Sequence, residues 1–279
     1  MNGSGFIKRF LRHRGAVAGM VILACVLGMA LSAPILFPLG PWEFVGMPML
    51  RPGQDMEFPL GTDMLGRDML TAVFYGGRVS LMIGLAAALS TVVVGTVIGS
   101  VAGYFGGLVD DLLMRFTELF QTIPAFLFAF VIVALFTPSA YTIILALCMI
   151  AWPGVARLVR GETMRLRRSD YVQTCVAIGM TESKIIFTQI LPNCLAPIIV
   201  TASTLVASAI LVEAGLSFLG LGDPNLMSWG TMIAIGRDAL RSAWYLCAIP
   251  GVMILVTVLA LNLIGDGLND ALNPHLRSL

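Results

Sequence analysis

The side chains that most often carry catalysis or bind phosphate are few in this chain of 279 residues, and they lie far apart. A phosphate-binding Gly-Lys-Ser/Thr loop needs a lysine directly after a glycine, but neither Lys8 nor Lys184 has that neighbour. The two histidines, His13 and His275, lie near opposite ends of the chain and form no His-Glu-x-x-His zinc site. No histidine lies within a long apolar segment, where it could activate a serine. The sequence therefore predicts no catalytic residue and no enzyme activity, and any ATP that drives the protein must be bound by another subunit.

The five cysteines predict neither a metal site nor a disulfide framework. They are Cys25, Cys148, Cys175, Cys194 and Cys247, and no two of them form a Cys-x-x-Cys pair. Most lie in or beside apolar segments, where cysteine behaves as a small buried hydrophobe. The formal net charge of +1 gives no overall field that would attract nucleic acid. We predict no metal, no cofactor and no nucleic-acid partner.

The composition predicts a membrane protein. Hydrophobic residues make up 58% of the chain and charged residues only 12%. A water-soluble domain of this length cannot bury so much apolar surface, so the lipid bilayer is the expected solvent.

Long apolar segments predict six membrane-spanning helices in an all-α polytopic fold. A bilayer core requires about 20 apolar residues per helix. Four uncharged segments supply one span each, and a fifth is divided by Thr137-Pro138-Ser139 into two short helices joined by a tight turn. In chain order the segments are Gly15–Phe37, Val79–Val109, the divided Leu119–Ala156, Ile185–Val212 and Ser242–Gly265. The first could instead be a cleaved signal peptide, but it is longer than a normal signal core, which favours a retained helix.

The basic residues predict the orientation of these spans. Cytoplasmic segments of membrane proteins are enriched in Lys and Arg. With the N-terminus inside, the inner segments hold twelve of these residues: Lys8, Arg9, Arg12, Arg14, Arg115, Arg157, Arg160, Arg165, Arg167, Arg168, Lys184 and Arg277. The outer segments hold five: Arg51, Arg67, Arg78, Arg237 and Arg241. Both termini and the loop before the fifth span are therefore expected in the cytoplasm.

That inner loop predicts a rigid knob of two short helices. Asp170 can cap a first helix with Gln173 reaching back, and Gly179 can adopt the positive φ that ends it. Thr181 can then cap a second helix. The alternative is a solvated linker between two spans, but a flexible linker has no need of paired caps around one glycine.

The spacing of this loop resembles the loop of permease subunits of bacterial ATP-binding-cassette (ABC) importers. Gln173-Thr174-Cys175 stand where that family has Glu-Ala-Ala and depart from it at all three positions, while Gly179 and the closing Leu191-Pro192 match. Three more stretches are similar to the peptide/nickel-type branch of the family: Leu60–Asp68, Leu216–Gly222 with Ser228-Trp229-Gly230, and Asn262–Pro274. Together these motifs extend from about residue 60 to the end of the chain.

The resemblance implies a type I ABC importer fold in the bacterial inner membrane. The expected partners are a paralogous permease subunit, two cytoplasmic ATP-binding subunits and a periplasmic solute-binding protein. The chain would form half of a translocation pathway for peptides or a similar small solute. Its ATPase-coupling loop would comprise Gln173, Thr174, Cys175, Ile178, Gly179, Met180 and Thr181. The expected division is 1–78 for the N-terminus, first span and periplasmic segment, 79–270 for the five-helix core, and 271–279 for a cytoplasmic tail.

An ion-coupled secondary transporter is the alternative function. Such a protein needs polar groups at mid-membrane beside broken helices. Acidic residues are scarce inside the predicted spans, which disfavours ion coupling.

Two charged sites outside the loop, Glu213 and the cluster Asp63–Asp68, have open roles. Glu213 lies at the edge of a long apolar span, where it could face the translocation pathway or pair structurally near the outer water interface. Asp63, Arg67 and Asp68 precede the second span on the outer side, and a brace of the external mouth is favoured over contact with a delivery protein. Trp42, Trp229 and Trp244 are expected in the outer aromatic belt.

The second span carries a stripe of small residues. Gly95, Gly99 and Gly103 recur at every fourth position, and Gly84 and Ala88 extend the stripe. Such a stripe lets two helix backbones approach closely. Packing within the chain is favoured over contact with another subunit.

Overall fold

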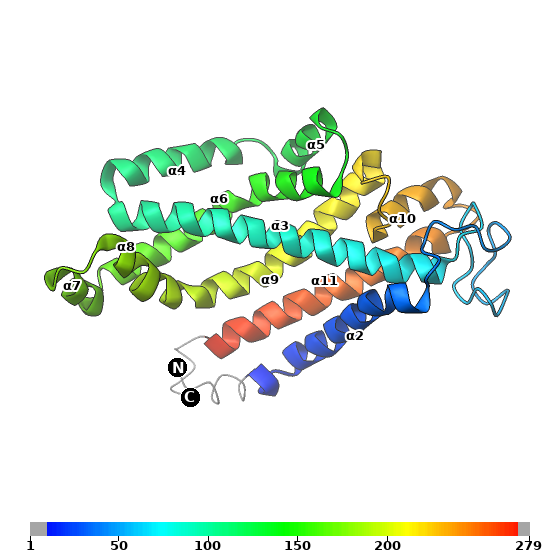
Figure 1. Ribbon diagram of the computed structural model, residues 1–279, viewed down its shortest axis with the longest axis horizontal. Helices are drawn as coiled ribbons and strands as arrows, with labels where there is room; N and C mark the ends of the chain where they lie inside the picture. The colour runs from blue at the N-terminus through cyan, green and yellow to red at the C-terminus, as the bar shows by residue number, and fades with distance from the viewer. Residues whose placement is uncertain (1–9, 273–279) are drawn as a thin grey trace.

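The computed structural model describes residues 10–272, and helices form most of this part of the chain, with no β-strand in it. Predictions for residues 1–9 and 273–279, including most of the tail at 271–279, lie outside the described residues. Five helices are long and apolar enough to cross a membrane. They run roughly along the long axis of the molecule (Figure 1). They are α2 (Arg14–Leu36), α3 (Met69–Phe105), α6 (Ala140–Arg167), α9 (Leu191–Leu216, the main part of the span Glu182–Leu221) and α11 (Tyr245–Leu272).

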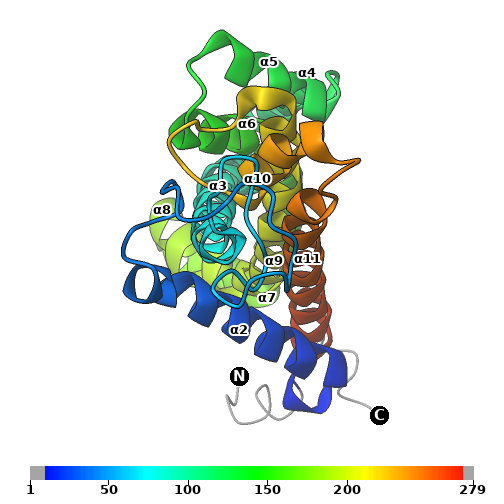
Figure 2. The same cartoon turned by 90° about the vertical axis from the view of Figure 1, so that its right-hand side faces the viewer.

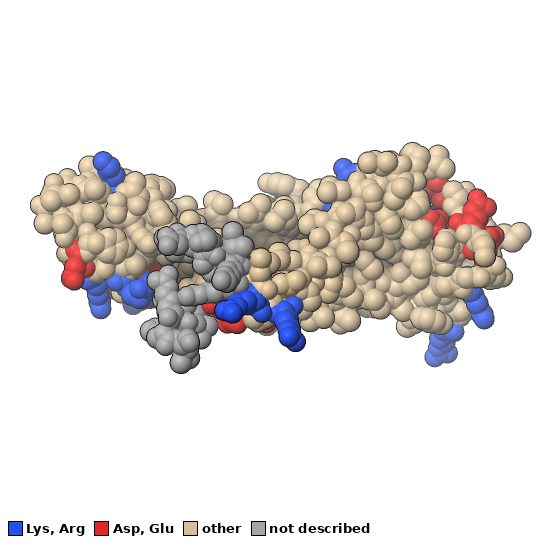
Figure 3. All heavy atoms as spheres, turned by 90° about the horizontal axis from the view of Figure 1, so that it is seen from below, with Lys and Arg blue, Asp and Glu red and all other residues tan. Residues whose placement is uncertain are grey.

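The charged residues are distributed as a membrane protein requires. On the face drawn in Figure 3, charged side chains gather at the left end, near the middle of the lower edge and at the right end, and the surface between the last two groups is mostly uncharged. Exposed leucine, valine and phenylalanine side chains are frequent on the long helices. This pattern confirms the prediction of a polytopic helical membrane protein.

The region between α3 and α6 differs from the prediction. It forms two helices, α4 (Gly107–Gln121) and α5 (Ala125–Leu135), which are bent by 81° relative to each other. Counting this pair as one span gives six spans. The predicted break at Thr137-Pro138-Ser139 is confirmed, since α5 ends at Leu135 and α6 begins at Ala140, but the second helix is not short: α6 has 28 residues and continues through Pro153. A further break lies before α5, where Pro124 has extended backbone and offers no N–H to a preceding turn.

The start of α3 also lies outside the predicted span. Asp68 caps the helix by accepting hydrogen bonds from the backbone N–H groups of Leu70 and Thr71. The helix therefore includes Arg78, and the proposed domain boundary between residues 78 and 79 falls inside it. It ends at Phe105 because Gly106 has a φ of +68°.

The small-residue stripe of α3 packs within the chain, as predicted. A Cβ added at Gly95 would lie 2.5 Å from Cβ of Val155 on α6, and one added at Gly103 would lie 2.6 Å from the backbone oxygen of Arg160. Gly84 faces Ile210 of α9 in the same way. Glycine at these positions lets α3 lie directly against α6 and α9.

The end of the molecule at the right of Figure 1 is formed by the segment 37–68, which loops across the start of α3, together with the short helix α10 (Trp229–Gly236) (Figures 1 and 2). Trp229 is fully buried and packs on Gly76 and Gly77 of α3, with its indole N–H donating to the Val73 oxygen. The prediction that Trp229 lies in an aromatic belt is therefore wrong. The ring is buried within the chain because two glycines of α3 leave room for it.

The start of α2 and the end of α11 lie toward the same end of the molecule (Figure 1). His13 caps α2 by accepting from the N–H of Ala16, and its Nε2 lies 3.5 Å from a carboxylate oxygen of Asp270 on α11. The helices α7 (Asp170–Ala177) and α8 (Glu182–Ile185) lie at this end too. The first span therefore starts at the same end of the molecule as the last span finishes, which is expected when the number of spans is even.

Candidate functional site

The knob formed by α7 and α8 projects beyond the long helices at one end of the molecule (Figure 1). An apolar anchor fixes it to the rest of the chain. Val172 of α7 is fully buried in a cluster with Ile185, Ile186 and Ile190 at the base of α9. The knob is therefore a folded extension of the bundle.

Gly179 ends α7 with the geometry that the sequence predicts. Its φ is +79°, its N–H donates to the Val176 oxygen, and the N–H of Met180 donates to the Cys175 oxygen. These two bonds form a Schellman motif, which requires a left-handed residue at the position of Gly179. A side chain with Cβ is strained at this φ, so glycine is needed for the backbone conformation.

The predicted caps around the glycine differ in detail. Ser169, not Asp170, occupies the N-cap position of α7, and Asp170 is the first helical residue, where its carboxylate suits the helix dipole. The Gln173 side chain does reach back, but it donates to the Arg167 oxygen at 2.7 Å. Thr181 is the N-cap residue of α8, as expected, although its side chain makes no capping bond.

The tip of the knob presents an apolar side chain beside polar ones. Ile178 is 72% exposed, and Gln173, Thr174 and Thr181 are exposed around it. Cys175 and Met180 are half-buried, and no atom lies within 4 Å of a Cβ added to Gly179. The exposed Ile178 and Val176 make the surface of the knob partly apolar.

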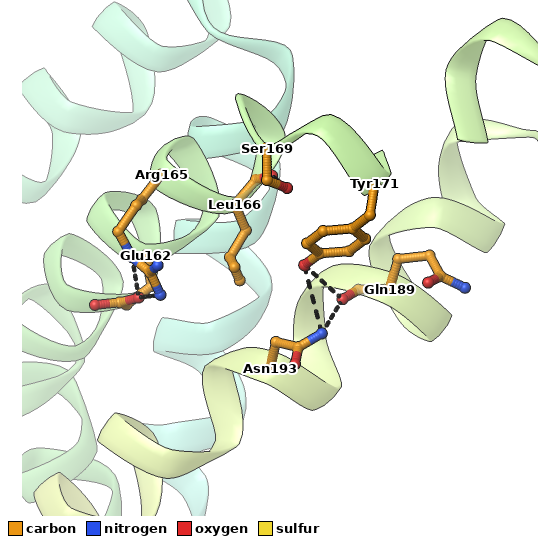
Figure 4. A network of polar contacts seen from close by, with 7 residues as sticks. All are labelled: Glu162, Arg165, Leu166, Ser169, Tyr171, Gln189 and Asn193. Atoms are coloured by element: carbon orange, nitrogen blue, oxygen red, sulfur yellow. Dashed lines mark hydrogen bonds and ion pairs between the residues drawn. The ribbon is translucent and has the colours of Figure 1, made fainter. Parts of the chain in front are cut away.

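A polar junction that the sequence analysis did not predict joins the knob to α9. The Asn193 side chain donates to the Gln189 backbone oxygen at 2.7 Å and lies 3.4 Å from the Tyr171 hydroxyl (Figure 4). The Tyr171 hydroxyl in turn lies 3.5 Å from the same Gln189 oxygen. The signal missed was the pairing of Tyr171, at the start of the loop, with the Asn193 that follows Leu-Pro.

A cleft of about 330 Å³ opens beside this junction, between the ends of α6, α9 and α11. Glu162 and Arg165 of α6 form an ion pair at 2.7 Å along one wall (Figure 4), and Asn193 and Asn269 add amide groups. The cleft thus combines both signs of charge with neutral hydrogen-bonding groups.

Glu213 lies at the opposite end of α9 and is only 1% exposed. Its Oε1 accepts hydrogen bonds from the hydroxyls of Ser217, at 2.8 Å, and Ser228, at 2.7 Å. Ser228 is the N-cap residue of α10, so the carboxylate holds the start of α10 against α9. The Oε2 atom has no hydrogen-bond partner within the described chain.

The outer acidic cluster forms a tight turn. Asp63 is buried and accepts from the N–H groups of Leu65 and Arg67. The Arg67 guanidinium lies 3.9 Å from Asp63 and 4.8 Å from the centre of the Trp42 ring. These contacts tie the turn at 63–68 to Trp42 of the same segment, and the brace of the external mouth stays a prediction.

The cysteines and acidic residues form no metal site in residues 10–272. No group of three metal-binding side chains occurs there, and all five cysteines are free thiols.

Comparisons with known proteins place the chain in a family. Residues 95–278 match the family described as "Binding-protein-dependent transport system inner membrane component", and residues 3–49 match the N-terminal transmembrane domain of oligopeptide transport permease C. The di/tripeptide transport system permease protein DppC of Pseudomonas aeruginosa is 38% identical to this chain, and the match covers 98% of this chain and 92% of that protein. The oligopeptide transport system permease protein OppC of Escherichia coli K12 is 40% identical to this chain, and the match covers 96% of this chain and 89% of that protein.

These matches cover nearly the whole chain, and they confirm the resemblance seen in the loop around Gly179 and in the three further motifs. The chain therefore belongs to the family of inner-membrane components of binding-protein-dependent transport systems, as a permease subunit of an ABC importer.

Proposed function

We propose that this permease subunit forms half of the pathway that carries peptides or a similar small solute across the bacterial inner membrane. The observation that carries the proposal is the knob of α7 and α8, a rigid projection with an exposed apolar tip in a chain without a phosphate-binding loop of its own. Such a knob suits a protein that receives mechanical work from a separate ATPase. The peptide class rests on the printed names of the relatives.

The complete machine would contain a paralogous permease, two cytoplasmic ATP-binding subunits and a periplasmic solute-binding protein. Both termini and the knob would lie in the cytoplasm, and the segment 37–68 with α10 would face the binding protein. The distribution of Lys and Arg supports this orientation. We retain the division into a first span with its outer segment and a five-span core, and we place the boundary at the start of α3, at Met69.

The coupling surface would comprise Gln173, Thr174, Cys175, Ile178, Gly179, Met180 and Thr181. In this proposal Ile178 docks in an apolar pocket of the ATPase and the exposed polar side chains fix its orientation. The Schellman turn at Gly179 keeps α7 and α8 at a constant angle. Closure of the ATPase pair then displaces the whole knob and, with it, the base of α9.

Replacing Gly179 tests the coupling role. Gly179→Val places a β-branched side chain at a φ of +79°, which costs about 1–3 kcal/mol and should misalign the two short helices. We expect the chain to insert normally, while the ATPase dissociates or hydrolyses ATP without moving solute. The measurement is ATP hydrolysis and uptake in proteoliposomes that contain the complete transporter, with binding protein and labelled dialanine.

Two further variants serve as controls for Gly179→Val. Gly179→Asn should retain much of the coupled transport, because asparagine tolerates the left-handed region. Gly53→Val introduces comparable strain at a φ of +76° in the outer segment, and it should leave ATPase attachment intact. If Gly179→Val carries out coupled transport at the normal rate, the proposed coupling role of the knob is wrong. If the unmodified transporter does not take up dialanine, only the proposal that the solute is a peptide is contradicted.

We also propose that Glu213 acts on the outer end of the pathway. By holding Ser217 and Ser228 it would keep α10 in place as a lid over α3 and α9. Its burial supports an effect through α10, without direct contact with the solute.

A further inference from the structure

The base of α9 is built as a hinge. A π-helical turn, Ile186–Ile190, lies between α8 and α9, and the N–H of Leu191 reaches back five residues to the Ile186 oxygen. π turns of this kind are rare and often mark functional sites. Pro192 and Pro197 follow, and neither can donate a hydrogen bond to the preceding turn. The backbone ladder is therefore weakened where the knob joins the span.

The Tyr171–Asn193 junction closes over this hinge. Asn193 donates to the Gln189 oxygen, which lies within the π turn, so a side chain adds a hydrogen bond where the ladder is loose. Tyr171 comes from α7, on the other side of the turn, and its hydroxyl meets both groups at 3.4–3.5 Å (Figure 4). One side chain of the knob is thus tied to one side chain of α9 across the hinge.

The apolar contacts at the same place are of a different kind. Val172 lies in an apolar cluster with Ile185, Ile186 and Ile190 of α8 and the π turn, and this cluster extends to Leu166 of α6 and Cys194 of α9. These contacts hold the knob to the bundle. Packing is non-directional, so it allows the knob to roll, whereas hydrogen bonds fix an angle.

We propose that Tyr171 and Asn193 are positioning residues that convert movement of the knob into bending of α9 at the π turn. The inference rests on the proposed coupling function and adds a transmission step to it. When the ATPase displaces α7, the Tyr171 hydroxyl carries Asn193 and the Gln189 carbonyl with it. The α9 helix then pivots about Ile186–Ile190. Without the junction, the knob moves on its apolar base and α9 lags behind.

The experiment uses the complete transporter with Tyr171→Phe, Asn193→Ala and the double variant. Tyr171→Phe keeps the ring and removes only the hydroxyl. Thr204→Val is the matched control, because the Thr204 hydroxyl also donates to a backbone oxygen, that of Thr201, but lies farther along α9 and spans no hinge. Spin labels at the exposed positions Leu211 of α9 and Leu255 of α11 report helix movement between the nucleotide-free state and ATP with vanadate.

We expect normal amounts of bound ATPase and normal ATP hydrolysis in all four variants. In Tyr171→Phe and Asn193→Ala, the population with the shifted label distance should fall about two- to tenfold, the ratio that one ordinary net hydrogen bond represents. The double variant should be no worse than the single ones, because both remove the same junction. Thr204→Val should match the unmodified protein.

Full movement of α9 in Tyr171→Phe and Asn193→Ala would overturn the inference, and so would losses that add in the double variant. If Gly179→Val uncouples the transporter while Tyr171→Phe does not, the knob keeps its role and only the transmission step fails. If Gly179→Val has no effect either, the coupling function itself fails.

Discussion

Single residues in this chain act through the backbone geometry that they permit. Gly179 matters because its φ allows the Schellman turn, and Gly76 and Gly77 matter because they admit the ring of Trp229. Glu213 is the clearest polar case, since one carboxylate oxygen receives two serine hydroxyls and joins α9 to α10. A buried group of this kind is costly to remove, because its partners lose their hydrogen bonds in a place that water does not reach.

Variants of Glu213 should separate hydrogen bonding from charge. Glu213→Gln keeps an oxygen that can accept from both serines, and it changes only the atom without a partner, so we expect a loss of stability below about 1 kcal/mol. Glu213→Ala leaves two hydroxyls unpaired beside a cavity and should cost about 2–4 kcal/mol. Thermal unfolding of the purified permease measures both, with the exposed Glu57→Ala as control. Equal losses of stability in Glu213→Gln and Glu213→Ala would contradict the role of these hydrogen bonds in joining α9 to α10.

Local residue signals were predictable from the sequence, and contacts between distant residues were not. The positive φ at Gly179 follows from a glycine placed after a short helix, whereas the N-cap differed by one residue because Ser169 and Asp170 are both good caps. The burial of Trp229 depends on glycines about 150 residues earlier in the chain, a contact that no local pattern encodes. The Tyr171–Asn193 junction was missed for the same reason.

At the scale of helices, close approach of backbones organises the bundle. The stripe on α3 predicted packing within the chain correctly, but only the structure names Val155 and Arg160 of α6 as the partners. The π turns at the two ends of α9, Ile186–Ile190 and Ser217–Leu221, were not foreseen, since a single widened turn of five residues is too short to change the periodicity of a helix-length window. The break before α5 depended on a proline that was read as part of an apolar run.

A pair of glycine-to-alanine variants tests the packing of α3 on α6. Gly99→Ala directs a Cβ at the backbone of α6 and should destabilise the permease by about 1–3 kcal/mol, because backbone cannot move aside. Gly154→Ala meets no atom within 4 Å and should be neutral or stabilising by up to about 1 kcal/mol, since alanine is the better helix former. Thermal unfolding in detergent measures both. Indistinguishable variants would mean that α3 and α6 are free to separate.

For the whole molecule, composition and motif spacing gave the fold class and family, and the relatives confirmed both. The number of spans is less simple, with five long helices and one bent pair. Hydropathy alone did not assign α4 to a span, because Asp110, Asp111, Arg115 and Glu118 interrupt its apolar residues.

Chemical labelling tests the orientation. Cysteines placed at Met56 in the outer segment and at Arg168 before the knob are both exposed, and they should react from opposite sides of the membrane. In a background without the native cysteines, an impermeant maleimide should label Met56→Cys in spheroplasts and Arg168→Cys only after permeabilisation. Labelling of both from one side would rule out the proposed topology.

The bend between α4 and α5 bears on how the cell must produce this subunit. At about 1.5 Å per residue, the 11 residues of α5 reach only about half of a hydrocarbon layer of about 30 Å. The break at Thr122–Pro124 is exposed, and backbone outside a helix is not tolerated against lipid. If the pair is counted as one span, we expect a second chain to cover this break in the assembled transporter. We then expect synthesis in step with that chain to protect the subunit from membrane proteases, which would degrade surplus copies.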